Sequence, residues 1–256
     1  MQQLNYISGT REEEAIDWLR SNIGNRHVLV CFSGGKDSVV TEHLCEMAGL
    51  SYSLNSTLTG IDPPQVTQFI RKQYPTCSFV RPHLSFWHLL TTHNPPGGTG
   101  KGIKWCCTKI KERPSAVIPI KHRIMGIRAE ESNTRAKYNR IDQVGDEVHY
   151  HPIFYWQTWE VFEFIERCHL PLPTLADGTC IYDHLDRVGC VICPNHPPGT
   201  HDIYRRLWPK HFECFERYVR IWWDKRVSQG REMYHGSPEE FLADWYRGKF
   251  FYYRVA

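Results

Sequence analysis

The chain has 256 residues, of which 41% are hydrophobic and 23% charged, and this composition excludes disordered, collagenous and coiled-coil proteins. Its 31 Lys and Arg residues against 28 Asp and Glu residues leave a formal charge of +3, which is too small to indicate nucleic-acid binding. No stretch is apolar enough to span a membrane, and residues 1–18 do not resemble a secretory signal, so we expect a cytoplasmic protein without membrane partners.

Short apolar runs alternate with helical repeats along the first third of the chain, and this order predicts a parallel β-sheet. The predicted elements are a helix over residues 11–23, a strand over 27–32, a helix over 37–48, a strand over 51–58 and a helix over 64–74. Residues 93–102 are rich in Pro and Gly and predict a loop that is mobile or acts as a lid.

The remainder of the chain predicts one more strand and several helices. These are a strand over residues 122–127, a helix within 153–165 whose start at Thr158 resembles a capped N-terminus, and helices over 204–227 and 239–245. Trp208, Trp222 and Trp245 recur among apolar residues of these helices and are expected in the core. The fold class is therefore predicted as α/β: a Rossmann-like three-layer domain with a mostly parallel sheet and a helical C-terminal extension.

A glycine turn joins the first predicted strand to the next helix. Backbone N–H groups at such a helix start bind anions, and glycines let a phosphate approach closely. Lys36 would neutralise the phosphate charge, Asp37 would hold Mg2+ and Ser38 would hydrogen-bond an oxygen. The alternative is an ordinary strand-to-helix turn in which Asp37 balances the helix dipole. The turn consists of Ser33, Gly34, Gly35, Lys36, Asp37 and Ser38.

This SGGKDS turn resembles the PP-loop of the ATP pyrophosphatase, or adenine nucleotide alpha hydrolase, superfamily. The resemblance implies that the loop grips pyrophosphate while ATP is split between its α and β phosphates. In one branch of the superfamily the nucleotide is instead phosphoadenosine phosphosulfate or adenosine phosphosulfate. ATP and Mg2+ are therefore the expected ligands.

Four cysteines form two pairs, Cys106-Cys107 and Cys190-x-x-Cys193. Two sulfurs at i and i+3 can converge on one metal centre, and a second pair nearby would complete a four-thiolate site. The alternative is that Cys106 and Cys107 are buried as small hydrophobic residues while Cys190 and Cys193 flank a turn. The residues alone leave the two possibilities open.

The segments around these cysteines resemble the assimilatory sulfate reductase family, as do residues 126–135 and 152–156. Together the matching blocks run from about residue 27 to residue 194. The resemblance implies a [4Fe-4S] cluster held by Cys106, Cys107, Cys190 and Cys193. It also implies catalytic roles for Lys36, Asp37 and Arg128. The expected nucleotide-binding residues are Ser33, Gly34, Gly35, Lys36, Asp37, Ser38, Thr59, Gly60, Gly126, Arg128, Glu131 and Arg135.

One departure from the family changes the expected function. Those reductases carry a sulfur-attacking cysteine in a C-terminal E-C-G-L-H segment, whereas here no cysteine follows Cys214, which lies in a helix-like segment and is expected to pack in the core. The chain therefore looks more like the ATP pyrophosphatase component of DNA phosphorothioation systems, with a cysteine desulfurase as sulfur donor. The alternatives are a sulfonucleotide reductase that borrows a thiol, a tRNA thiolation enzyme, and a binding module without turnover.

Residues 101–140 contain eleven Lys or Arg residues against three Glu residues, which suits a polyanion. DNA is the preferred acceptor and tRNA the alternative, but a solvated face around a small nucleotide explains the same charges. Trp105, beside the cysteine pair, is the candidate for base stacking. The expected division is a PP-loop core over 1–165 and a cluster-completing segment with a helical cap over 166–256, joined in one compact unit. A second copy of the chain is the expected oligomeric partner.

Overall fold

The computed structural model describes residues 10–97, 105–197 and 199–253. The contacts divide the chain into two compact units. Unit 1 comprises Met1–Ser56, Gln65–Phe79 and Ile118–Asp183, and unit 2 comprises Thr57–Pro64, Val80–Val117 and His184–Ala256. Each unit is built from three segments of the chain. The expected division into domains at residue 165 stays a prediction.

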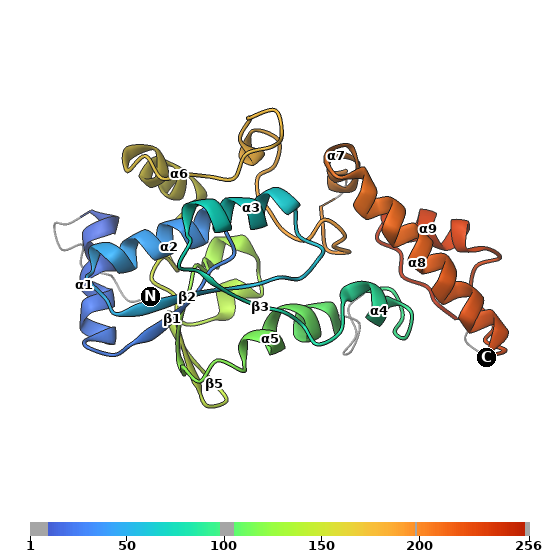
Figure 1. Cartoon of the computed structure of the whole chain (residues 1–256), viewed down its shortest axis with the longest axis horizontal. Coiled ribbons are helices and arrows are strands. Elements are labelled where there is room, and N and C mark those ends of the chain that lie inside the picture. The colour runs from blue at the N-terminus through green and yellow to red at the C-terminus, as the bar shows by residue number, and fades with distance from the viewer. Residues whose placement is uncertain (1–9, 98–104, 198, 254–256) are drawn as a thin grey trace. The chain divides into compact units, whose positions relative to one another are not determined.

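A six-stranded sheet forms the centre of the α/β fold (Figure 1). The strands are β1 (Val28–Cys31), β2 (Tyr52–Thr57), β3 (Ser78–Val80), β4 (His122–Met125), β5 (Ile141–Val144) and β6 (Glu147–Tyr150), in the order β3-β2-β1-β4-β6-β5. Strand β1 pairs in parallel with β2 and β4, β6 pairs in parallel with β4, and β5 pairs antiparallel with β6. The predicted Rossmann-like class with a mostly parallel sheet is thus confirmed.

The strand order places a switch in direction between β1 and β4. From β1 the chain moves outward through β2 and β3, and it returns on the other side of β1 as β4. Because the strands are parallel, Cys31 and Met125 lie in register at their carboxyl ends. Open α/β sheets bind ligands at such a switch point, where the loops that follow the two strands diverge. The loop after β1 is the glycine turn.

Four helices accompany the sheet: α1 (Arg11–Ile23), α2 (Lys36–Met47), α3 (Pro64–Gln73) and α6 (Thr158–Arg167). Thr10 caps α1 through a reciprocal box in which its hydroxyl accepts from Glu13 N at 3.3 Å and the Glu13 carboxylate accepts from Thr10 N at 2.8 Å. Helices α1 and α6 both pack on α2, whose Val39, Val40 and Leu44 are completely buried.

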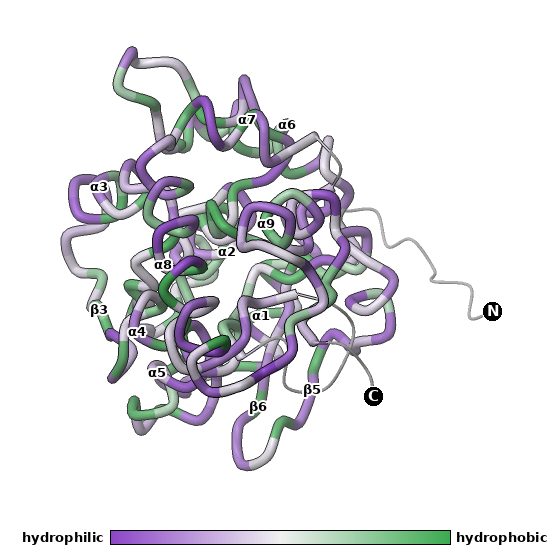
Figure 2. The backbone as a smooth tube through the Cα atoms, turned by 90° about the vertical axis from the view of Figure 1, so that its right-hand side faces the viewer, coloured by the Kyte–Doolittle hydropathy of each residue, from purple (hydrophilic) through white to green (hydrophobic). Residues whose placement is uncertain are grey.

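Unit 2 is mainly helical. Its elements are α4 (Phe86–Leu90), a π-helical turn (Cys107–Glu112), α5 (Arg113–Ser115), α7 (Thr200–Leu207), α8 (Pro209–Ser228) and α9 (Pro238–Tyr246). Figure 2 shows both hydrophilic and hydrophobic residues along α8. Its buried residues Phe212, Phe215, Val219 and Trp222 recur every three or four positions, the spacing of one helix face. Trp208, Trp222 and Trp245 are at most 4% exposed, which confirms that they belong to the core.

Aromatic side chains anchor the described start of the predicted loop over 93–102. Trp105 Nε1 donates to the Asn94 carbonyl at 2.8 Å, and Trp245 Nε1 donates to the Pro96 carbonyl at 2.7 Å. Trp105 is buried and stacks on Phe86 with ring centroids 5.3 Å apart, so the expectation that Trp105 stacks on a base is wrong: its faces are used in packing. Residues 98–102 of the predicted loop lie outside the described residues.

Most predicted helices and strands are confirmed within a few residues, and the helix within 153–165 begins at Thr158 as expected. The single helix predicted over 204–227 is wrong: the structure has two helices, α7 and α8, divided at Trp208 because Pro209 lacks the N–H that a continuous helix needs. Strand β3, helix α4 and the β5–β6 hairpin were not predicted. Among the described residues, no helix combines the length and apolar character that crossing a membrane requires.

Candidate functional site

The glycine turn after β1 has a backbone that only glycine adopts easily. Gly34 has φ +73°, and a Cβ added there would lie 2.8 Å from Ile70 Cγ1 and 2.9 Å from Val66 Cγ1 of α3. Both the left-handed backbone and the contact with α3 therefore exclude a side chain at this position. The turn places the amides at the start of α2 at the carboxyl end of β1.

Two serines brace the turn. Ser38 Oγ donates to the Gly35 carbonyl at 2.8 Å, and Ser33 Oγ donates to Ser38 Oγ at 3.2 Å and accepts from Gly35 N at 3.4 Å. Gly35 is the N-cap residue of α2 and offers no side-chain cap. Its carbonyl accepts from Ser38 N at 3.0 Å, and the Lys36 amide, the first of the helix, is left to an acceptor outside the helix. Such amides, with the helix dipole behind them, favour an anion.

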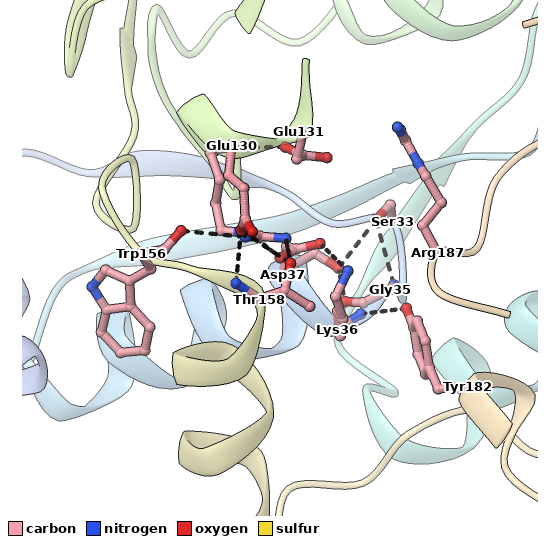
Figure 3. A network of polar contacts seen from close by, with 12 residues as sticks. Ser33, Gly35, Lys36, Asp37, Glu130, Glu131, Trp156, Thr158, Tyr182 and Arg187 are labelled. Carbon is pink, nitrogen blue, oxygen red and sulfur yellow. Dashed lines mark hydrogen bonds and ion pairs between the residues drawn. The ribbon is translucent and has the colours of Figure 1, made fainter. Parts of the chain in front are cut away.

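Lys36 is the first residue of α2 and only 3% exposed. Its ammonium group lies 3.0 Å from Asp37 Oδ2 and over the rings of Phe162 and Tyr182, at 5.9 and 5.6 Å from their centroids. Its backbone N–H donates to the Tyr182 hydroxyl at 2.7 Å (Figure 3). The ammonium group and the backbone N–H of Lys36 therefore both contact groups of the protein itself.

Arg128 follows β4 and approaches the same carboxylate. Its Nε lies 2.6 Å from Asp37 Oδ1 and its Nη1 2.5 Å from Glu130 Oε2, while Nη1 and Nη2 also donate to Trp156 O and Thr158 Oγ1, both at 3.2 Å. Burial opposes the charge of the guanidinium, but the carboxylates of Asp37 and Glu130 outweigh it and raise the pKa of Arg128. Asp37 thus balances two buried cations at the switch point.

The remaining predicted residues after β4 support this arrangement. A Cβ on Gly126 would lie 2.6 Å from the Asp37 carbonyl oxygen, so the end of β4 and the first turn of α2 are in backbone contact. Glu131 Oε2 accepts from Arg128 N at 3.0 Å and pairs with Arg135. Gly126, Arg128, Glu131 and Arg135 therefore form one network with the loop. Their contacts are with protein groups, and their roles toward a nucleotide stay predictions.

Tyr182 is a site residue that sequence analysis missed. It stands in a 3-10 turn (Ile181–Asp183), 146 residues from the amide that it contacts, and no motif marks it. Figure 3 shows its ring beside Lys36, with the hydroxyl directed toward the start of α2. Trp156 and Thr158 reach the same network through a carbonyl, a hydroxyl and an amide.

Thr59 and Gly60 belong to unit 2. Thr59 is 5% exposed and donates to Asp62 Oδ2 at 2.5 Å, and its hydroxyl accepts from Ile61 N at 3.1 Å. Gly60 has φ +75°, as a tight turn requires. These contacts explain Thr59 as a turn residue, and its predicted nucleotide contact remains a prediction.

Unit 2 brings the four predicted cysteines into electrostatic contact. The pKa of Cys106 is raised well above its ordinary value, first by a hydrogen bond with Cys107, then by burial and by the charges of Cys107, Cys190 and Cys193. Burial likewise raises the pKa of Cys190 and of Cys193. Lys111 is an exposed residue whose ammonium group donates to Cys190.

Histidine rings hold the backbone of the second cysteine pair. His196 Nε2 lies 2.9 Å from the Cys190 carbonyl, and His201 Nε2 lies 2.9 Å from the Cys193 carbonyl. The two rings contact each other edge to face at 5.3 Å. Within the part of the chain that the structure describes, no group of three or more His, Cys, Asp or Glu residues is arranged to hold a metal ion. The predicted cluster therefore stays a prediction.

Most basic side chains of residues 101–140 contact protein groups. Lys101 and Lys104 lie outside the described residues, Lys109 contacts His93 and Lys111 contacts Cys190. The ion pairs are Lys121–Asp146, Arg123–Glu147, Arg128–Asp37, Arg135–Glu131 and Arg140–Glu14. Arg113 and Lys137 are exposed. Carboxylates of the protein thus balance part of the positive charge of residues 101–140.

Cys214 was expected in the core. It lies within α8, is half-buried, and has Arg217 Nη2 3.9 Å from its sulfur. Its place on the helix gives it a packing role on one side and solvent on the other.

Comparisons with known proteins place the site in context. Residues 27–196 match the family described as phosphoadenosine phosphosulfate reductase domain. The chain is 25% identical over 229 residues to uncharacterized protein MJ0066 of Methanocaldococcus jannaschii, covering 84% of this chain and 46% of that protein. It is 23% identical over 188 residues to adenosine 5'-phosphosulfate reductase of Staphylococcus haemolyticus, covering 70% and 75%. The chain therefore spans about half the length of the Methanocaldococcus relative.

Solved structures with a similar arrangement include two synthetases. NH3-dependent NAD synthetase from Campylobacter jejuni gives a TM-score of 0.42 at 14% identity, covering 62% of this chain and 72% of that one. NMN synthetase from Francisella tularensis gives a TM-score of 0.43 at 15% identity, covering 81% and 91%.

Proposed function

The chain belongs to the phosphoadenosine phosphosulfate reductase domain family, and on that premise we propose that it is an ATP pyrophosphatase acting in sulfur incorporation. The observation that carries the proposal is the turn from Ser33 to Ser38 at the switch point of the sheet. There the amides at the start of α2 and the ammonium of Lys36 meet at one edge of the sheet, beside the carboxylate of Asp37. This combination suits the pyrophosphate portion of ATP.

The chemistry assigned to these residues is positioning and charge stabilisation. An oxygen of the acceptor forms a bond to the α phosphorus of ATP, and the bond from that phosphorus to the β-phosphate oxygen breaks, which releases pyrophosphate. Charge develops on the departing pyrophosphate, and amides fixed by the turn stabilise it without rearranging. Lys36 would turn its ammonium group from Asp37 Oδ2, which is now 3.0 Å away, to a pyrophosphate oxygen. Arg128 would then hold Asp37 in place.

The donor set at the loop fits Mg2+ in its chemistry. Asp37 is a carboxylate of the turn, and its Oδ2 would be released when Lys36 turns to phosphate. Mg2+ typically takes one or two carboxylates and completes its shell with phosphate oxygens and water. When it is bound with ATP, the Mg2+ ion would neutralise part of the negative charge of the phosphates.

The four cysteines of unit 2 also fit a [4Fe-4S] cluster in their chemistry. Such a cluster takes one thiolate for each of its four irons, so the sulfurs need not converge on a single ion. Cys106 interacts electrostatically with Cys107, Cys190 and Cys193, and the backbone of the second pair is fixed by His196 and His201. When bound, the cluster would relay sulfur or tune the site.

We propose DNA as the acceptor and a cysteine desulfurase as the sulfur donor. Activation of a backbone phosphate as its adenylate provides AMP as a leaving group. The terminal sulfur of the donor's persulfide bonds to phosphorus as AMP leaves, and a thiol then takes the inner sulfur as a disulfide, so that one sulfur replaces one non-bridging oxygen. Arg113 and Lys137 are exposed basic residues available to a phosphate backbone. A tRNA acceptor would use the same chemistry, and a second copy of the chain is the proposed oligomeric partner.

The test is product analysis with anaerobically purified protein, given either ATP and Mg2+ or adenosine phosphosulfate and a thiol. AMP and pyrophosphate from ATP are expected, with at least a hundredfold loss in Lys36→Met because one charge-stabilising donor is removed. Lys72→Met, which removes an exposed lysine of α3, is the matched control and should retain activity. Full activity in Lys36→Met would remove the loop from the mechanism.

Other products would point to the alternatives. Sulfite from adenosine phosphosulfate with ATP untouched would identify a reductase, as the name of the Staphylococcus haemolyticus relative suggests. ATP turnover that rises with tRNA and not with DNA would identify a tRNA thiolation enzyme. Nucleotide affinity without products would identify a binding module.

The cluster has its own test. Iron and acid-labile sulfide are measured in the anaerobically purified chain and in Cys190→Ser, with Cys214→Ser on α8 as the matched control. Loss of iron in Cys190→Ser alone is expected. Equal iron in all three proteins would contradict the assignment of Cys190 as a ligand.

A further inference from the structure

The hydroxyl of Tyr182 occupies the first amide of α2. Lys36 N donates to Tyr182 Oη at 2.7 Å, and this amide belongs to the first turn, whose N–H groups have no acceptor within the helix. An anion bound at the helix start would use the same donor. Tyr182 therefore stands where a phosphate oxygen of the proposed ligand would accept a hydrogen bond.

The Tyr182 side chain is held against the loop by several contacts. Its ring meets that of Phe162 edge to face at 5.6 Å, and the Lys36 ammonium lies 5.6 Å from its centroid. A Cβ on Gly35 would lie 3.2 Å from the Tyr182 hydroxyl, so a glycine at that position leaves room for it. The neighbouring Ile181 is fully buried and anchors the turn. The hydroxyl is thus positioned by packing, and rotation about the side-chain torsions is the way it would leave.

Both donors of Lys36 are engaged at once. The ammonium pairs with Asp37 and the amide donates to Tyr182, so a bound pyrophosphate would have to replace a carboxylate and a hydroxyl. A phosphate oxygen is charged, and hydrogen bonds to charged acceptors are roughly twice as strong as those to neutral ones. A ligand without phosphate offers no acceptor that outcompetes the hydroxyl.

We propose that Tyr182 is a stand-in for the ligand's phosphate oxygen and is displaced when a phosphate-bearing ligand binds, so that it lowers the affinity of the site for such ligands and leaves the affinity for neutral nucleosides unchanged. The inference rests on the proposed function, because it takes the loop to be the pyrophosphate site. Tyr182 keeps the Lys36 amide hydrogen-bonded until a charged oxygen arrives. It competes with the phosphate oxygen for this donor and takes no part in bond breaking.

The test uses Tyr182→Phe, which keeps the ring against Phe162 and removes only the hydroxyl. Affinities for inorganic pyrophosphate, ATP and adenosine are measured by titration calorimetry on the full chain. Because a net hydrogen bond is lost on displacement in the wild type, the variant should bind pyrophosphate and ATP about three- to tenfold more tightly. Adenosine affinity should not change. Tyr138→Phe, at a tyrosine of unit 1 that is 43% exposed, is the matched control and should bind like the wild type.

The outcomes separate this inference from the proposed function. If the wild type binds pyrophosphate and Tyr182→Phe binds it equally or more weakly, the displacement is wrong while the nucleotide site stands; weaker binding would mean that the hydroxyl donates to the bound phosphate. Tighter binding of adenosine and pyrophosphate alike would also overturn the inference, since the hydroxyl would then hinder ligands without phosphate as well. A wild type that binds neither ATP nor pyrophosphate overturns the proposed function and this inference with it.

Discussion

Replacement of Arg128 by methionine tests whether burial decides the strength of the ion pairs at the switch point. The Arg128 side chain is 3% exposed and contacts Asp37, which is 19% exposed, and Glu130, which is 38% exposed. Arg128→Met keeps most of the apolar stem and removes the charge. Asp37 keeps Lys36 as its remaining cationic partner, and the Trp156 carbonyl and Thr158 hydroxyl each lose a donor.

Breaking one partner of a buried ion pair costs about 3–5 kcal/mol. Here the two carboxylates keep some contact with solvent, and Asp37 retains Lys36, so we expect a loss near the lower end, about 3 kcal/mol in the free energy of unfolding. The matched control is Lys121→Met, which breaks a pair with Asp146 whose side chains are 48% and 74% exposed. Solvent screens such exposed pairs, so this variant should lose far less stability than Arg128→Met.

Urea unfolding followed by circular dichroism measures both losses. Hydrogen exchange of the α2 amides then places the loss of Arg128→Met in unit 1, since the chain has two compact units that need not unfold together. Equal losses in the two variants, or a loss below about 1 kcal/mol in Arg128→Met, would refute the reasoning that burial sets the strength of this pair.

Two further predictions concern the packing and the charges around α2. Gly126→Ala should lower the free energy of unfolding by about 1–3 kcal/mol, because its Cβ would lie 2.6 Å from the Asp37 carbonyl oxygen. Thermal unfolding measures this loss, and Gly189→Ala, whose Cβ would have no atom within 4 Å, is the control that should match the wild type. Wild-type stability in Gly126→Ala would contradict the close contact with Asp37. Burial raises the pKa of Glu42 in the folded chain, so its stabilising contribution is full at low pH and is lost as pH rises through that pKa. Glu42→Gln keeps an acceptor for the Tyr52 hydroxyl, which donates to Glu42 at 2.8 Å in the wild type. In urea titrations the variant should be more stable than the wild type at pH 7 and equally stable near pH 4. A stability difference that does not change with pH would argue against the raised pKa of Glu42.

The sequence by itself identified those elements in which the apolar residues repeat over enough positions to show a helical or strand period. Helices α1 and α2 repeat their apolar residues over about three turns, and their positions were predicted within a few residues. The apolar pattern of α7 continues into α8, and the two were predicted as one helix. The turn after β1 was also predicted from the sequence, because glycine conformations and the amides at a helix start are local properties of the backbone. Strand β3 and helix α4 have three and five residues, too few for a period to stand out.

The β5–β6 hairpin was missed although it turns at Gly145, which has φ +62° and precedes Asp146. Its strands are four residues each, and one of them is mostly exposed, so the alternation of apolar and polar residues was weak. A glycine beside an acidic residue was the signal that could have located it.

The resemblance singled out Arg128, but only the tertiary structure showed what it touches. Arg128 lies 91 residues from Asp37, and the two meet because β4 returns beside β1. The same holds for Tyr182, whose hydroxyl reaches the Lys36 amide across 146 residues, and for Trp105, whose faces are covered in the core. Local pattern determined where a glycine turn opens a helix, because a helix start presents its amides whatever follows in the chain. Tertiary structure decided which side chains occupy that turn, because contacts between distant segments depend on the order of strands in the sheet.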